Sequence, residues 1–245
     1  MDDPEPAGCR AFVLHDSALL VDRVELALHH ARFVVRAAGT LVEARRLIAG
    51  WRPDLAILDM DHPDSGQLLA GLVASRGEGA PNTILGLVRR HDLATTLRTF
   101  ALGATDIVSV PFTPDELVAR AVARSRRATG RSRAVVPTVV VGEVELDIVG
   151  REVRTETAVV HLTGLDQSLL YLLASRAGEV VTRQEICAAM WGDGLDAMST
   201  IVDRQVRSLR VKLQDDDREP RLIATVPGRG YRLEAGAAAF EAGSG

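Results

Sequence analysis

The amino-acid sequence predicts an α/β fold class: a doubly wound, five-stranded parallel sheet followed by a second, smaller domain. Before residue 124, five short apolar runs alternate with amphipathic segments, which is typical of buried parallel strands joined by helices. A polar, basic run, RSRRATGRSR at 124–133, interrupts this pattern, and strand-like residues restart at Val135. The length of 245 residues also favours two domains over one.

The expected strands of the first domain are 11–14, 33–35, 55–58, 84–88 and 107–110. The helices between them have recognisable starts. Ser17 precedes the first, Thr40 forms a capping box with Glu43, and Thr113-Pro114 opens the last. Functional residues of such sheets gather at the carboxyl ends of the strands. Those ends carry His15-Asp16, Asp59, Val88-Arg89 and Val110-Pro111.

The second domain is expected to begin with a small antiparallel platform formed by 139–146 and 159–162. Three helices follow. Thr163 is the expected N-cap of the first, and Thr182 caps the second in a capping box with Glu185.

The third helix has two different faces. At 100° per residue, one stripe is apolar and consists of Val202, Val206, Leu209 and Leu213. The opposite face consists of Thr200, Arg204, Arg207, Ser208 and Val211. A hairpin follows, in which Gly228-Arg229-Gly230 places an arginine at the tip. An arginine-bearing helix beside a basic hairpin predicts DNA binding through groove and backbone contacts.

The composition of the chain narrows the classes of protein to which it can belong. The chain is 47% hydrophobic with a net charge of −4, so DNA binding must come from a local basic face. No apolar run approaches the length of a membrane span, and the acidic start is no signal peptide, which predicts a cytoplasmic protein. Cys9 and Cys187 lie far apart and indicate small buried residues, neither a disulfide nor a metal cluster.

The expected domain organisation has five segments. They are a disordered N-terminus at 1–9, the α/β domain at 10–124, a basic linker at 125–137, the DNA-binding domain at 138–234 and a disordered tail at 235–245.

Blocks in both halves resemble the OmpR/PhoB family of bacterial response regulators. In the first half they are PDLAILD at 53–59, GATDIVSVPF at 103–112 and PDELVAR at 114–120. In the second half they are LTGLDQSLLYLL at 162–173, VVTRQEICAAMWG at 180–192, VDRQVRSLRVKL at 202–213 and ATVPGRGYRL at 224–233. The resemblance covers nearly the whole chain in the family's order. It implies a flavodoxin-like receiver domain followed by a winged helix-turn-helix domain.

The resemblance also implies a degenerate phosphoacceptor pocket. Asp59 takes the position of the phosphoacceptor, and His15-Asp16 stands where the family has two acidic Mg²⁺ ligands. Val88 replaces a threonine or serine, and Val110 replaces a lysine. Imidazole is a poor ligand for Mg²⁺, so Mg²⁺ binding is expected to be weak or absent. No other cofactor or metal is expected.

Two further departures accompany these. Ile107 replaces an aromatic switch residue, and the loop 61–66 is one residue shorter than usual. Losing two hydrogen bonds to a charged group costs about 3–6 kcal/mol. Switching a receiver almost completely from its inactive to its active state needs about 5.5 kcal/mol, so the loss is as large as the whole switch. The sequence therefore predicts a regulator that works without phosphorylation of Asp59, with a cognate histidine kinase a doubtful partner.

Two alternatives stay open: a conventional two-component response regulator phosphorylated on Asp59, and a regulator whose receiver binds a small molecule in a cavity lined by Val88, Val110 and His15. Asp59 is otherwise expected to pair with His15 or with loop amides. The other histidines of the first domain are interpreted as surface residues, namely His29, His30, His62 and His91. An enzyme is not expected, because no phosphate-binding glycine loop follows strand 1 or strand 4.

The resemblance assigns DNA contacts residue by residue. Arg204 and Ser208 take the base-reading positions. The expected phosphate and backbone contacts are Thr200, Gln205, Arg207, Arg210 and, from the wing, Thr225. Pro227 replaces a wing arginine that often enters the minor groove, and Arg229 substitutes for it at the tip.

A homodimer that forms without phosphorylation is expected through the helix 4–strand 5–helix 5 face. Asp106 and Arg120 match one ion pair of that face, and Glu116 is also present. Such pairs contribute only about 0–1 kcal/mol each, so apolar contacts must add to them. Candidates are Leu93, Leu97, Phe100 and Leu117. The loop 192–198 corresponds to the region through which the family contacts RNA polymerase.

Overall fold

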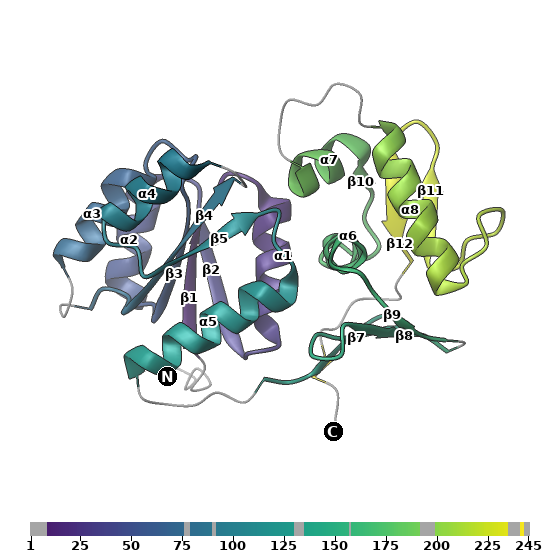
Figure 1. The fold of residues 1–245 in the computed structure, drawn as a ribbon, viewed down its shortest axis with the longest axis horizontal. Helices are drawn as coiled ribbons and strands as arrows, with labels where there is room; N and C mark the ends of the chain where they lie inside the picture. The colour runs from purple at the N-terminus through teal and green to yellow at the C-terminus, as the bar shows by residue number, and fades with distance from the viewer. Residues whose placement is uncertain are drawn as a thin grey trace, which may run out of the picture.

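The computed structural model describes residues 9–75, 79–89, 92–129, 135–156, 158–191, 199–234 and 241–242. The first domain contains five strands that alternate with five helices (Figure 1). In chain order they are β1 (Cys9–Leu14), α1 (Ala18–His29), β2 (Phe33–Ala38), α2 (Leu41–Trp51), β3 (Leu55–Asp59), α3 (Ser65–Ala74), β4 (Thr83–Arg89), α4 (Leu93–Ala101), β5 (Asp106–Val110) and α5 (Pro114–Thr129).

The predicted five-stranded parallel sheet is confirmed. Its strand order is β2-β1-β3-β4-β5, and every neighbouring pair is parallel. One apolar cluster fills the face covered by α1 and α5, and a second fills the face covered by α2 and α3. The predicted caps also form, since the Ser17 and Thr40 side chains accept hydrogen bonds from the backbone N–H groups of Leu20 and Glu43. The carboxyl ends of β1, β3, β4 and β5 therefore meet at one edge of the sheet.

The second domain has two antiparallel sheets around three helices. Its elements are β6 (Thr138–Val141), β7 (Val144–Asp147), β8 (Glu152–Arg154), β9 (Val159–His161), α6 (Gly164–Ala174), β10 (Val181–Thr182), α7 (Arg183–Trp191), α8 (Ser199–Leu213), β11 (Ile223–Val226), β12 (Gly230–Leu233) and β13 (Glu241–Ala242). The first sheet has the order β13-β6-β7-β8-β9 and the second β10-β12-β11. The predicted capping box of Thr182 and Glu185 forms in both directions, and the expected N-cap Thr163 forms a capping box with Asp166.

Three expected boundaries need correction. Residues 125–129 were expected to belong to the linker but continue α5, because alanine and arginine favour helix and Arg126 and Arg127 stabilise its last turn. Cys9 lies in β1 and not in a disordered terminus. The expected disordered tail contains β13, which pairs with β6. Residues 1–8, 130–134, 235–240 and 243–245 lie outside the described residues.

The two domains share one hydrophobic core. The cluster that lies under α1 and α5 continues into the second domain through α6 and α7 (Figure 1). The Ser168 hydroxyl donates to the backbone oxygen of Phe112 across this boundary at 3.0 Å. The second domain is therefore packed directly against the first.

Candidate nucleic-acid interface and receiver pocket

The predicted two faces of α8 are present in the structure. Val202, Val206, Leu209 and Leu213 are all buried. Thr200, Arg204, Arg207, Ser208 and Val211 are exposed. Val211 is 71% exposed. This face, which we call the reading face, offers two guanidinium groups, two hydroxyls and one isopropyl group to a groove.

The β-hairpin beside α8, here called the wing, consists of β11 and β12. Gly228 has φ +69°, a left-handed conformation that suits glycine in a tight turn. Gly230 has no room for a side chain, because a Cβ atom would lie 2.0 Å from the backbone oxygen of Val181. Arg229 is exposed at the tip, as expected from the sequence.

Arg210 departs from its predicted role as a phosphate contact. Its side chain is buried beneath the wing. Nε donates to the backbone oxygen of Ile223 at 3.0 Å, and the terminal nitrogens donate to Asp217 at 3.1 Å and Thr225 Oγ1 at 2.8 Å. The helical period places Arg210 at the edge of the reading face, but the wing covers that edge. Arg210 therefore attaches the wing to α8 and is not free to bind DNA, while Thr225 itself stays exposed.

Gln205 also differs from its expected position. It is half-buried, and its Nε2 donates to Asp166 Oδ1 at 2.9 Å. Asp166 is buried at the start of α6 and accepts from Lys212 as well. Gln205 thus connects α8 to α6, which leaves Thr200 and Arg207 as the exposed candidates for phosphate contact on this helix.

A second attachment of the wing was not foreseen from the sequence. The Tyr231 hydroxyl donates to Asp203 Oδ1 at 2.6 Å, and Arg183 Nε donates to the same oxygen at 2.7 Å. Burial, together with the bond to Asp203, raises the pKa of Tyr231 to about 12, so the hydroxyl keeps its proton. The wing, α7 and α8 are therefore held together by a partly buried polar network.

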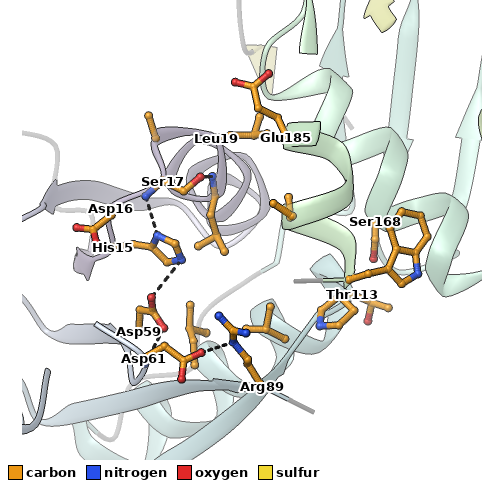
Figure 2. A pocket seen from close by; sticks show the side chains of 18 of the residues that line it. His15, Asp16, Ser17, Leu19, Asp59, Asp61, Arg89, Thr113, Ser168 and Glu185 are labelled. Atoms are coloured by element: carbon orange, nitrogen blue, oxygen red, sulfur yellow. Dashed lines mark hydrogen bonds and ion pairs between the residues drawn. The ribbon is translucent and has the colours of Figure 1, made fainter. Parts of the chain in front are cut away.

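The expected pairing of Asp59 with His15 is present in the pocket at the carboxyl edge of the parallel sheet (Figure 2). His15 Nε2 lies 3.6 Å from Asp59 Oδ2, and His15 Nδ1 accepts from the Ser17 N–H at 2.8 Å. Asp59 Oδ1 accepts from the Asp61 N–H at 3.1 Å. Burial lowers the pKa of His15, although Asp59 and Asp16 oppose the shift, so the imidazole favours its neutral form at neutral pH.

Two histidines interpreted as surface residues are buried. His62 is 6% exposed, and its Nε2 lies 3.0 Å from both Asp16 Oδ1 and the backbone oxygen of Gly39. His30 is fully buried at the boundary between the domains. Both side chains use both ring nitrogens in hydrogen bonds, which sequence spacing does not reveal. His29 is half-buried, and His91 lies outside the described residues.

The expected place of Val88 in the pocket is corrected. Val88 packs with the apolar cluster on the opposite face of the sheet. Because side chains alternate along a strand, Leu87 and Arg89 face the pocket instead. Arg89 Nε donates to Asp61 Oδ2 at 2.6 Å (Figure 2). The sequence places Arg89 at a strand end but gives no sign that it points toward Asp59's side of the sheet.

The pocket opens into a cleft between the domains, with a volume of about 1160 Å³. His15, Asp59 and Val110 line it from the first domain, and Ser168 and Glu185 line it from α6 and α7. Leu19 of α1 and Glu185 of α7 also line this cleft, one from each domain (Figure 2). The cavity that the sequence suggested within one domain is therefore a cleft formed by both.

The expected dimer face carries an ion-pair network within one chain. Arg120 bonds to Asp106 at 3.2 Å and to Glu116 at 3.0 Å, and Arg124 bonds to Asp106 at 2.9 Å. Burial raises the pKa of Asp106, but the Ile107 N–H and the two arginines outweigh it and leave the pKa below its usual value. Leu93, Leu97 and Phe100 of α4 are exposed, whereas Leu117 is buried in the domain's own core. The expectation that Leu117 contributes an apolar contact to the dimer is therefore wrong.

Two absences, of a metal-ligand cluster and of a membrane-spanning helix, hold for the described part of the chain. Within it, no group of three or more histidine, cysteine, aspartate or glutamate side chains is placed to hold a metal ion. Among the helices described, none is long and apolar enough to cross a membrane. The loop 192–198, the expected contact region for RNA polymerase, lies outside the described residues.

An α/β domain joined to a helix-and-wing domain defines a class of DNA-binding regulators, and comparisons with known proteins agree. Residues 156–233 match the family described as "Transcriptional regulatory protein, C terminal". The chain is 37% identical to the transcriptional regulatory protein PcoR of Escherichia coli over 183 residues, covering 74% of this chain and 78% of PcoR. It is 30% identical to the DNA-binding response regulator MtrA of Mycolicibacterium smegmatis, covering 91% and 96% of the two chains.

Among solved structures, the chain is similar to the response regulator DrrB, an OmpR/PhoB homologue of Thermotoga maritima. The sequence identity is 25%, the TM-score is 0.42, and the match covers 93% of this chain and 100% of DrrB. The sequence matches above show that this chain belongs to the OmpR/PhoB family of response regulators. It is a DNA-binding transcription regulator with a receiver domain and a winged-helix domain.

Proposed function

We propose that this regulator binds DNA as a homodimer without needing phosphorylation of Asp59. The observation that carries the proposal is the contact between His15 and Asp59. An imidazole occupies the place beside the phosphoacceptor position where the family has a carboxylate, and it holds the aspartate side chain.

The donor set of the pocket does not fit Mg²⁺, which the family's phosphorylation chemistry uses. Mg²⁺ prefers an octahedral set of hard oxygen ligands. Here Asp16 is turned toward His62 Nε2 at 3.0 Å, and Asp59 is turned toward His15. The two carboxylates are thus engaged by two different imidazoles. This arrangement supports a pocket held in one state by histidine–aspartate contacts.

The neighbouring strands support the same proposal. Val110 contributes an apolar side chain to the cleft where the family has a lysine, and Val88 is turned away from it. One observation favours the conventional alternative, which is that Arg89 brings a positive charge to the cleft. That guanidinium is already bound to Asp61, so using it for a phosphoryl group would require breaking the pair.

The homodimer is proposed through α4, β5 and α5. Leu93 and Leu97 of α4 are 67% and 60% exposed, and Phe100 is 47% exposed. Side chains of this kind that lie together on one helix face indicate a protein contact. The Asp106–Arg120 network lies beside them and can exchange partners with a second copy of the chain.

The DNA contacts are proposed from exposure and chemistry. Arg204 and Ser208 read base edges, and Thr200 and Arg207 contact phosphates. Thr225 contacts the backbone from the wing, since Arg210 occupies one side of its hydroxyl and leaves its hydrogen free to donate outward. Arg229 reaches the backbone or the minor groove from the wing tip.

The test is to incubate the full chain with acetyl phosphate and Mg²⁺ and to compare it with the Asp59→Asn variant. The affinity of each protein for a DNA duplex that the native chain binds is then measured. We expect the two proteins to have the same affinity for this duplex, with and without the phosphodonor. Asp54→Asn is the matched control, because it makes the same chemical change just before the start of β3, at the end of the strand opposite Asp59 and outside the proposed dimer face. Stoichiometric phosphorylation of Asp59 that raises DNA affinity would contradict the proposal and favour the conventional regulator.

A further inference from the structure

The helix α8 carries polar side chains along both edges of its reading face. At 100° per residue, Gln205 and Lys212 share one stripe, because residues seven apart are separated by almost two full turns. Asp203 and Arg210 share another stripe for the same reason. These two stripes lie about 100° to either side of the centre of the reading face. The buried apolar stripe of α8 lies between them on the far side of the helix.

The edge formed by Gln205 and Lys212 is held by a single carboxylate, that of Asp166 at the start of α6. Gln205 Nε2 donates to Asp166 Oδ1 at 2.9 Å, and the Lys212 ammonium donates to Oδ2. Oδ2 also accepts from the Thr163 N–H at 3.0 Å. The Asp166 side chain is only 1% exposed, so water competes little for these bonds. We call Asp166, Gln205 and Lys212 the α6 clamp.

The chemistry of residue 212 suits the α6 clamp. Lys212 is the only lysine of the chain, and the other basic side chains of α8 are arginines. The planar fork of an arginine matches two acceptor oxygens, whereas an ammonium is a compact point charge. Because Gln205 already occupies Asp166 Oδ1, one oxygen is left for the cation. A lysine fits this single oxygen better than an arginine does.

The other edge of the reading face is held by the wing. Asp203 accepts from the Tyr231 hydroxyl at 2.6 Å, and Arg210 donates to Thr225 Oγ1 at 2.8 Å. Burial of the apolar stripe alone would let α8 roll about its axis, because the hydrophobic effect has no preferred direction. Hydrogen bonds are directional. Bonds on both edges therefore fix the rotation of α8 about its own axis.

We infer that Asp166 is a positioning residue for sequence discrimination by α8. This role rests on the proposed reading of base edges by Arg204 and Ser208. Base pairs differ in the pattern of donors and acceptors that they present in the groove. A side chain that reads this pattern must be held to within about 10–20° of its productive geometry. Contacts with phosphates depend mainly on charge and tolerate more rotation. The α6 clamp thus acts on the choice of sequence, while the phosphate contacts supply general affinity.

The experiment measures a preference, defined as the affinity of the full-length protein for a duplex that the native chain selects from random DNA, divided by its affinity for single-base variants of that duplex. The test variant is Asp166→Leu with Lys212→Met. It replaces a buried ion pair by apolar side chains, which leaves the free energy of unfolding little changed, and it keeps the net charge. We expect a near-native unfolding midpoint and a preference lower by about fivefold or more. A folded double variant with the native preference would overturn the inference.

A second variant tests the α6 clamp without touching an ion pair. Gln205→Leu removes the donor to Asp166 Oδ1 and leaves Lys212 in place. We expect the preference to fall by about twofold to fivefold, with an unchanged salt slope of binding. An unchanged preference would overturn the inference even if the double variant failed to fold.

Thr163→Ala is the matched control for a general loss of stability. It removes the N-cap of α6, but both bonds from α8 to Asp166 remain. We expect this variant to be less stable and to keep the native preference. A loss of preference as large as that of the double variant would show that the preference follows the stability of the domain, which would overturn the positioning role.

Arg204→Ala separates the inference from the proposed DNA contacts on which it rests. If Arg204→Ala keeps the native preference, the proposed reading of bases by Arg204 fails, and the inference fails with it. If Arg204→Ala loses the preference while the two variants of the α6 clamp keep it, the inference alone fails.

Discussion

Arg204 and Arg207 lie three residues apart on α8 and are both exposed, yet they are expected to act differently. By the family's pattern Arg204 points at base edges and Arg207 at phosphates. Arg207 is also 3.5 Å from Asp217, a weak surface ion pair that DNA would replace. Exposure alone does not separate the two roles, so the separation has to be measured.

We predict that Arg204→Ala relaxes discrimination by about 1–3 kcal/mol at one base pair of the operator. Arg207→Ala should instead weaken binding to all sequences alike and reduce the salt slope of binding by about 1. Binding to a panel of single-base operator variants at several salt concentrations measures both effects. Equal losses on every sequence for both variants would show that the roles are assigned wrongly.

The sequence predicts this face well for a simple reason. The helical period of 3.6 fixes which residues share a face, so Val202 and Leu209 are correctly predicted as core and Arg204 as exposed. The same period cannot show what covers the edge of a face. Arg210 is chemically identical to Arg207, and only the hairpin that folds back from Ile223 buries it.

The pocket shows the same limit. Residues brought together by the ends of adjacent strands, such as His15 and Asp59, could be paired from the sequence because parallel strand ends meet. The direction in which each side chain points could not be predicted from the sequence. Whether Val88 or its neighbour Arg89 faces the cleft depends on the phase of β4, which a continuous apolar run does not reveal.

The wing is an element that owes its position to two polar attachments. Arg210 joins it to α8, and the Tyr231–Asp203–Arg183 network joins it to α7 and α8. A two-stranded hairpin is only marginally stable by itself in water. The contacts proposed between DNA and Thr225 and Arg229 therefore depend on side chains that lie outside the proposed DNA-binding surface.

We predict that Arg210→Ala lowers the free energy of unfolding by about 3 kcal/mol, because it removes a buried guanidinium that donates to the Ile223 backbone oxygen and pairs with Asp215 and Asp217. Chemical denaturation measures this. The salt slope of DNA binding should stay unchanged, since Arg210 does not contact phosphate. Arg207→Ala is the matched control with the opposite pattern, a changed slope and unchanged stability. If instead Arg210→Ala changed the salt slope and left the stability unchanged, Arg210 would be a phosphate contact after all.

The interface between the two domains, formed by α1 of the receiver with α6 and α7, buries a histidine whose pKa depends on whether the domains are packed together. Burial lowers the pKa of His30 to about 4, although its bond to the Val136 oxygen opposes the shift. The neutral ring accepts from Tyr171, and a protonated ring could not. The other titratable groups that act on it are His29 and Asp147. Packing of the two domains against each other therefore disfavours protonation of His30.

The sign of the pH effect follows from linkage. Undocked, His30 returns to an ordinary pKa near 6.5, so between pH 6.5 and 4 the undocked form binds more protons than the docked form. The free energy that holds the two domains together is therefore most favourable above pH 6.5. It becomes less favourable as the pH falls toward 4, and it changes little below pH 4. The full effect is about 3 kcal/mol at most.

We predict that the full chain expands in small-angle scattering as the pH falls from 7 to 5. His30→Asn keeps a donor near the Val136 oxygen but removes the titration, so its scattering profile should change much less over this range. Identical pH dependence of the two proteins would mean that His30 does not control docking.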